Sequence, residues 1–131
     1  MAFQVATTGT SVAVELSGWD RAMNRRRRVE FDTEGISEVS VADRSSLEIM
    51  IDHRALGCGT HNGSKRPGRR RIGTMLGRGV PGKQFWAARK GPCSSQLVVL
   101  DLVGHEFVRA VLDVEEPESF LASIAEALDR T

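Results

Sequence analysis

The sequence has little that would hold a domain together covalently or anchor it in a membrane. Its 131 residues include only two cysteines, Cys58 and Cys93, which are too few for a disulfide scaffold. In the cytosol both thiols are expected to be reduced, although the sequence alone leaves a bridge between them open. No apolar run approaches the ~20 residues that a membrane-spanning helix needs. These shortages exclude a small disulfide-stapled domain and predict no transmembrane helix.

Export features are also missing from the first ten residues. They have neither the basic start nor the apolar core of a secretory signal, so the cytoplasm is the predicted compartment. The length fits a single domain over residues 1–131, with a core over about 11–128. A domain of this size buries roughly two-thirds of its unfolded surface. An apolar content of 40% and a charged content of 27% are typical of a globular chain and argue against disorder.

Carboxylates are missing from the middle of the chain. Residues 53–100 carry ten basic and no acidic side chains, whereas residues 1–52 carry six and nine, and residues 101–131 carry two and eight. The middle segment alone therefore has a charge of +10, which favours anionic partners. The alternative is a solvated basic loop without function. GC-rich coding by itself can favour arginine, and carboxylates from the other segments can neutralise part of the charge.

The basic residues lie in connections that are rich in glycine and proline. The loop over about 57–71 is long enough to be functional or mobile. Arginine and lysine in such connections can reach phosphate or other anions. The candidate anion-binding residues are therefore Lys65, Arg66, Arg69, Arg70, Arg71, Arg78 and Lys83. Nucleic acid is disfavoured as the anion, because Phe85 and Trp86 are the only segment aromatics that could stack on bases, and alternation exposes at most one of them.

Alternation of apolar and polar side chains predicts most of the regular structure. Val12, Val14 and Leu16 repeat at period two, which is typical of a half-buried strand. Similar alternation predicts four further strands, at residues 29–32, 36–42, 71–76 and 84–90. After Asp43 the pattern predicts a short helix, with continued strand as the alternative.

The last third of the chain has the pattern of a β-hairpin followed by an amphipathic helix. Residues 96–114 form the predicted hairpin, with Gly104 and His105 as a two-residue type II′ turn in which glycine accepts the positive φ. Pro117 suits the first position of a helix that continues to Leu128, and one face of this helix is apolar. Such a helix has to cover an apolar surface.

Together these patterns indicate a mainly β fold, a sandwich or barrel of about seven antiparallel strands capped by a C-terminal α-helix. Six segments carry a further signal through their order: 14–20 (VELSGWD), 59–61 (GTH), 72–74 (IGT), 84–86 (QFW) with Arg89, 97–101 (LVVLD) and 111–118 (VLDVEEPE). In these segments the chain resembles the bacterial pleckstrin-homology-like domains found as small stand-alone proteins. The resemblance covers most of 11–128. It implies two roughly orthogonal antiparallel sheets, a helix closing one open end, and no catalytic residues.

Motifs for metal, cofactor or covalent chemistry are incomplete. Cys58 and His61 are spaced like half of a zinc site, and His53, Cys93 or His105 would have to complete it. The glycines of residues 57–63 do not have the spacing of a dinucleotide fingerprint. No nucleophile lies in a local catalytic signature. The sequence therefore predicts no resident metal, no cofactor and no enzymatic activity.

The leading hypothesis is a non-catalytic binding or scaffolding module. Its basic loops between Lys65 and Lys83 would contact an acidic protein or an anionic membrane surface. One alternative is a structural protein that assembles into homo-oligomers through exposed sheet edges or through a hairpin face carrying Phe107 and Val111. Another is a small-molecule enzyme that uses the loop of Cys58 and His61.

Overall fold

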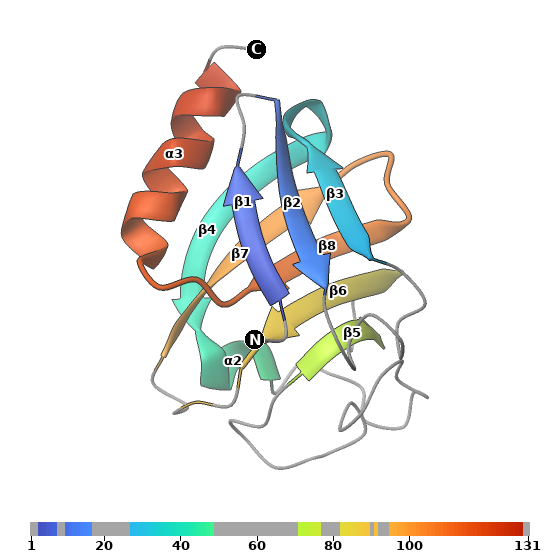
Figure 1. The fold of residues 1–131 in the computed structure, drawn as a ribbon, viewed down its shortest axis with the longest axis vertical. Helices are drawn as coiled ribbons and strands as arrows, with labels where there is room; N and C mark the ends of the chain where they lie inside the picture. The colour runs from blue at the N-terminus through green and yellow to red at the C-terminus, as the bar shows by residue number, and fades with distance from the viewer. Residues whose placement is uncertain are drawn as a thin grey trace.

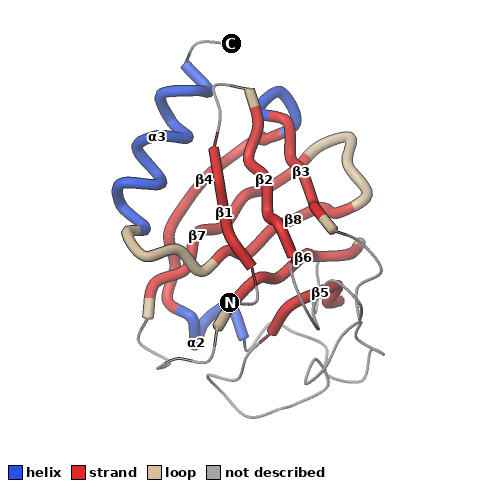
Figure 2. The backbone as a smooth tube through the Cα atoms, viewed as in Figure 1, coloured by secondary structure: helices blue, strands red, loops and turns tan. Residues whose placement is uncertain are grey.

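The computed structural model describes residues 3–7, 10–16, 27–48, 71–76, 82–89, 91 and 95–129. These residues form eight strands in two sheets, and a C-terminal helix lies beside the sheets (Figures 1 and 2). The mainly β architecture with a final helix is therefore confirmed. The predicted hairpin strands and the C-terminal helix are present at nearly the expected residues.

The first sheet is an antiparallel meander. It consists of β1 (Phe3–Thr7), β2 (Ser11–Leu16) and β3 (Arg28–Asp32), in that order across the sheet. Strand β1 was not predicted. In β3 the side chains alternate between exposed and buried, because Val29 and Phe31 face the core while the charged residues between them face solvent.

The second sheet has five strands in the order β4–β7–β8–β6–β5. Their bounds are β4 Ile36–Asp43, β5 Arg71–Leu76, β6 Lys83–Ala88, β7 Gln96–Leu102 and β8 Phe107–Leu112. The 3-10 turn η1 (Thr33–Gly35) joins the two sheets, and the short helix α2 (Arg44–Glu48) follows β4, as expected after Asp43.

The expected count of about seven strands is close to the eight described, but the expectation that all of them are antiparallel is wrong for one pair. The structure has an eighth strand, β1, and β6 pairs with β8 in parallel. Strand β8 lies between β7, its antiparallel hairpin partner, and β6, with which it runs in parallel. Side-chain alternation is the same in parallel and antiparallel strands, so it does not reveal the direction of a neighbour.

The main core lies between the two sheets. Buried side chains from β2 and β3 meet those of β6, β7 and β8, and Ile124 of helix α3 (Pro117–Asp129) joins the same cluster. The helix packs against β4 and β7, and its half-buried Phe120 and Leu128 contact this cluster. The apolar stripe of the helix therefore covers the core, as the sequence predicts.

A second, smaller cluster lies on the other face of the five-stranded sheet. It contains Trp86 and Ala88 of β6, whereas Phe85 and Ala87 of the same strand belong to the main core. The two faces of β6 therefore alternate as predicted. Trp86 is fully buried and its indole Nε1 donates a hydrogen bond to Gln84 Oε1 at 3.1 Å, which satisfies the polar end of the ring.

Two details of the hairpin differ from expectation. Four residues, 103–106, separate β7 from β8, so the turn is not a two-residue type II′ turn, although Gly104 does adopt a positive φ of 73°. Strand β8 also contains a bulge, because Lys83 and Gln84 are adjacent on β6 while their partners on β8 are Phe107 and Arg109.

Because of the bulge, Phe107 and Val111 lie on opposite faces of the sheet, so the predicted shared face is wrong. The extra residue between Phe107 and Arg109 turns the Phe107 ring into the main core, whereas Val111 lies in the second cluster. Both side chains are buried, at 1% and 0% exposure. The expected apolar patch of Phe107 and Val111 on a shared outer face does not exist.

Candidate functional site

Most of the predicted anion-binding residues lie outside the described part of the chain. This applies to Lys65, Arg66, Arg69, Arg70 and Arg78. Two of the set are described in part or in full, because Arg71 is the first residue of β5 and Lys83 is the first residue of β6. The loop over 57–71 and the anion-binding role of its basic residues therefore stay predictions from the sequence.

Lys83 lies at an exposed strand end. Its ammonium is 3.8 Å from the carboxylate of Glu106 and 5.9 Å from the centre of the Phe107 ring. About half of each charged side chain is exposed, so the ion pair is worth little in stability. Lys83 therefore has a carboxylate partner in the free protein, and an external anion would compete with Glu106 for it.

The candidate zinc ligands Cys58 and His61 lie outside the described residues, as do His53 and Cys93. Among the residues that the structure does describe, no group of three or more His, Cys, Asp or Glu side chains could hold a metal ion. His105 is described, and both of its ring nitrogens contact the backbone.

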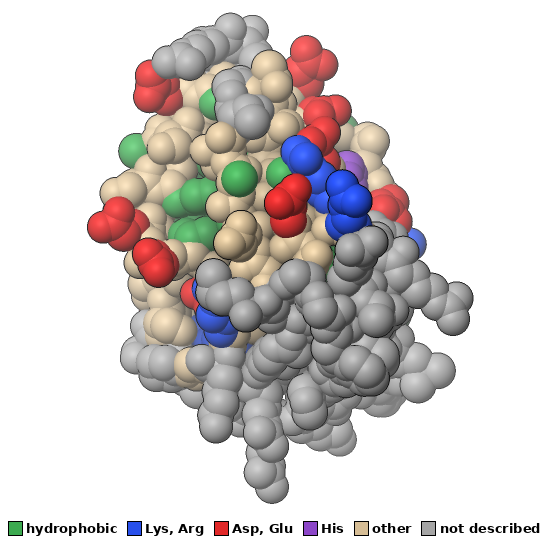
Figure 3. Space-filling view, in the orientation of Figure 1, with side chains coloured by type: hydrophobic (Ala, Val, Ile, Leu, Met, Phe, Trp, Pro, Cys, Tyr) green, Lys and Arg blue, Asp and Glu red, His purple; other side chains and the backbone are tan. Residues whose placement is uncertain are grey.

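One hollow is a groove of about 360 Å³ between two segments that are distant in sequence. One wall is the backbone and side chains of Gln4, Val5 and Ala6 in β1. The opposite wall is the connection from β8 to α3, residues 113–115. Hydrophobic side chains show at the surface between β1 and α3, with acidic side chains around them (Figure 3). The half-buried Val5 and Val114 pack on the main core below the groove.

Arg89 and Asp113 also line this groove. The backbone N–H of Arg89 donates to Asp113 Oδ2 at 3.0 Å, and its guanidinium Nη1 lies 3.9 Å from the same carboxylate oxygen. The guanidinium carbon lies 4.4 Å from the centre of the Phe3 ring, a cation–π contact. The side chain of Arg89 is 42% exposed. Its charge is balanced by Asp113, so this pair adds little net charge to the groove.

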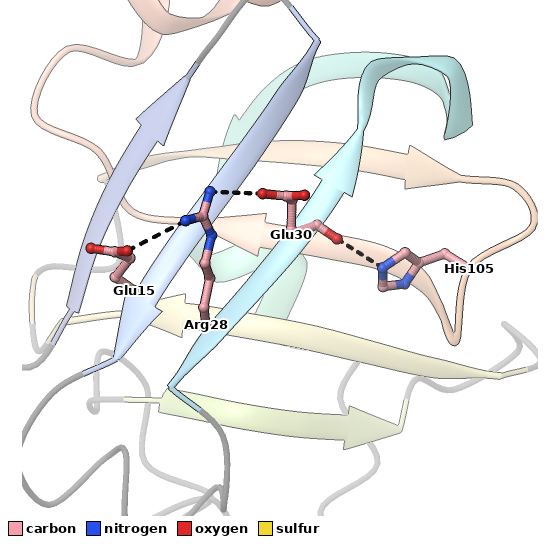
Figure 4. Close-up of polar contacts among 4 residues, drawn as sticks. All are labelled: Glu15, Arg28, Glu30 and His105. Atoms are coloured by element: carbon pink, nitrogen blue, oxygen red, sulfur yellow. Dashed lines mark hydrogen bonds and ion pairs between the residues drawn. The ribbon is translucent and has the colours of Figure 1, made fainter.

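Two further carboxylates make the groove acidic. Glu15 on β2 lies 3.6 Å from Arg28, and the same guanidinium is 2.7 Å from Glu30, so Arg28 is shared between two carboxylates (Figure 4). Glu115 is exposed and has no hydrogen bond or ion pair within the described residues. Glu15 and Glu115 therefore leave a negative charge that the neighbouring arginines do not fully balance.

A second hollow, of about 240 Å³, lies where β3 and η1 meet the β7–β8 turn. Its wall includes Asp32, Glu34 and His105. The His105 ring packs between Phe31 and Phe107, with ring centres 5.1 and 5.8 Å away, and its Nε2 lies 3.0 Å from the Glu30 carbonyl oxygen (Figure 4). With both nitrogens held by the backbone, this imidazole is positioned as a structural contact between the sheets.

The groove was missed at the sequence level because its walls are 107 or more residues apart. The available signal was the alternation of Phe3 and Val5 with Gln4 and Ala6, which would have indicated a first strand. The hydrogen bond between Arg89 and Asp113 carries no local signature.

Comparison of the chain with protein-family models, with curated proteins and with solved structures gave no match. Within the described residues, neither helix combines the length and the apolar character that crossing a bilayer requires.

Proposed function

We propose that this protein is a non-catalytic binding module that contacts an anionic partner through its acid-free basic segment. The observation that carries the proposal is the division of charge. Among the residues whose side chains the structure describes, 13 are acidic and only six are basic. The six basic residues are Arg27, Arg28, Arg44, Lys83, Arg89 and Arg109. The candidate residues between Lys65 and Arg78 lie in a stretch that has no carboxylate of its own.

The cations of the described scaffold support this division. Four of them have a carboxylate within 4 Å: Arg28 with Glu15 and Glu30, Lys83 with Glu106, Arg89 with Asp113, and Arg109 with Asp101. A fifth, Arg44, is buried at 1% exposure and donates to the Arg89 carbonyl oxygen. The sixth, Arg27, is exposed. Five of the six scaffold cations are thus balanced or buried, which supports the acid-free segment as the better binding surface for an anion.

The pleckstrin-homology-like fold and the cytoplasmic location are part of the same proposal. Two sheets around one core and a C-terminal helix packed on it support the fold assignment. The parallel pairing of β6 with β8 is a departure from the antiparallel sheets that the resemblance implies. An acidic protein and an anionic membrane surface present the same chemistry to arginine, and separate binding experiments distinguish the two.

The test compares two double variants that each remove two positive charges. We expect Arg69→Ser with Arg70→Ser to weaken binding to phosphatidylserine vesicles or to polyglutamate about thirtyfold, at about 1 kcal/mol for each basic residue near an anionic surface. Arg28→Ser with Arg109→Ser is the matched control on the scaffold, because carboxylates balance both guanidinium groups, and it should change binding little. The proposal would be refuted if both double variants lost the same amount of binding affinity. It would also be refuted if the wild-type protein bound neither the vesicles nor polyglutamate.

A further inference from the structure

The four edge strands of the two sheets differ in how they are protected against pairing with another strand. Proteins protect such edges with charges, bulges or covering elements. Strand β3 exposes Arg28, Glu30 and Asp32. Strand β4 has an irregularity between Ile36 and Glu38 and packs against α3. Strand β5 pairs with β6 in regular register but contains Gly73 at a φ of 135°, and an internal glycine weakens a strand.

Strand β1 has none of these protections among the described residues. Its sequence, FQVAT, contains no charge and no proline, and all five of its residues pair in regular register with β2. Its described sheet neighbour is β2 alone. The groove of about 360 Å³ lies against Gln4, Val5 and Ala6 of this strand. The unprotected edge therefore borders a hollow into which an extended chain can fit.

The apolar and charged residues of the groove indicate which peptide composition would bind there. Val5 and Val114 provide a half-buried apolar floor. Glu15 and Glu115 provide negative charge, while the charge of Arg89 is balanced by Asp113. An incoming strand would place alternate side chains toward the floor and toward solvent. Apolar side chains on one face and basic side chains on the other match this surface.

We propose that this groove binds an extended basic peptide segment of a partner protein, which pairs with β1 as an additional strand. Lysine or arginine side chains of the segment then lie near Glu15 and Glu115. A second copy of this chain is a poorer occupant. Symmetric pairing of β1 with β1 would bring two sets of the same carboxylates together, and like charges across an interface oppose association.

This site is separate from the proposed anion-binding segment and has the opposite charge. The two surfaces would allow the module to connect an anionic partner with a basic one. Because the peptide experiment uses neither vesicles nor variants of the basic segment, failure of either proposal leaves the other intact.

The probe is an acetylated and amidated heptapeptide of alternating lysine and valine, with the corresponding glutamate and valine peptide as control. Binding is followed by backbone amide chemical shifts of the full chain. We expect saturable shifts at Gln4, Val5 and Ala6 with the lysine peptide alone. Glu15→Gln with Glu115→Gln should weaken binding about threefold for each charge removed, whereas Glu38→Gln, which removes a carboxylate on β4, should not.

A further variant tests the edge itself. Ala6 is exposed, so Ala6→Lys places a positive charge at the edge while β1 keeps its partner β2. We expect this variant to lose binding of the lysine peptide and to retain the unfolding midpoint of the wild type. Equal binding of the glutamate peptide would overturn the proposal. The proposal would also be overturned if the unliganded protein formed dimers and Ala6→Lys abolished them, because a second copy of the chain would then occupy the groove.

Discussion

The imidazole Nε2 of His105 lies 3.0 Å from the backbone carbonyl oxygen of Glu30, which connects the β7–β8 turn of one sheet to β3 of the other. The second ring nitrogen, Nδ1, accepts the backbone N–H of Phe107 at 3.1 Å. A carbonyl oxygen can only accept and an amide N–H can only donate, so the proton of the neutral ring is on Nε2. Nε2 therefore links the two sheets at one corner, while Nδ1 fixes the ring within its own hairpin.

Replacement of His105 by phenylalanine should lower the free energy of unfolding by about 1–2 kcal/mol. The ring contacts with Phe31 and Phe107 can persist, but the Glu30 carbonyl and the Phe107 N–H lose their partner. Urea denaturation measures the change. Val103→Ala in the same turn is the control, because Val103 is 67% exposed and should tolerate the change within about 0.5 kcal/mol. Equal stability of the two variants would show that the hydrogen bonds of His105 contribute nothing.

Substitutions at Gly104 and Gly82 can distinguish the energetic cost of backbone strain from that of a steric clash. Gly104 has a φ of 73° and open space around its missing Cβ, so Gly104→Ala should cost about 1 kcal/mol through strain alone. Gly82 has a φ of 103°, and a Cβ there would lie 2.6 Å from Val108 Cγ1. Gly82→Ala should therefore cost clearly more, and Val108→Ala should rescue part of its loss. Thermal unfolding of the single and double variants tests the order, and a smaller loss at Gly82 than at Gly104 would contradict it.

Asp113 should matter more through its hydrogen bond to the backbone than through its ion pair. Asp113→Ala removes the acceptor for the Arg89 N–H and should lower the free energy of unfolding by about 1–2 kcal/mol. Asp113→Asn keeps an acceptor oxygen and loses only the 3.9 Å pair with a guanidinium that is 42% exposed, so its cost should stay below about 1 kcal/mol. Urea denaturation of both variants checks this. Equal losses would mean that the charge of Asp113 dominates.

The elements that local periodicity specifies were predictable from the sequence. Strand β2 and helix α3 follow from the spacing of their apolar residues, and Pro117 marks the first residue of the helix as expected. The two faces of β6 also separate as its alternation predicts. In each of these cases the pattern within one segment determines which side chains are buried.

Features that depend on distant segments were not predictable in this way. Periodicity in β6 and β8 cannot show that they are parallel neighbours. One extra residue in β8 was enough to turn Phe107 into the main core and to invalidate the expected face shared with Val111. The groove of Arg89 and Asp113 requires β1, which is only five residues long, to meet a connection more than 100 residues later.

The most direct test of the central claim is the salt dependence of binding to anionic probes. We propose measuring binding of the wild-type chain to phosphatidylserine vesicles and to polyglutamate at about 0.1 M and about 1 M salt, where the Debye length falls from about 10 Å to about 3 Å. Phosphatidylcholine vesicles are the neutral control. The binding-module account predicts tight binding to at least one anionic probe at the lower salt concentration, and its loss at the higher one. Binding that is equally strong at both concentrations, or equally strong to the neutral vesicles, would contradict it.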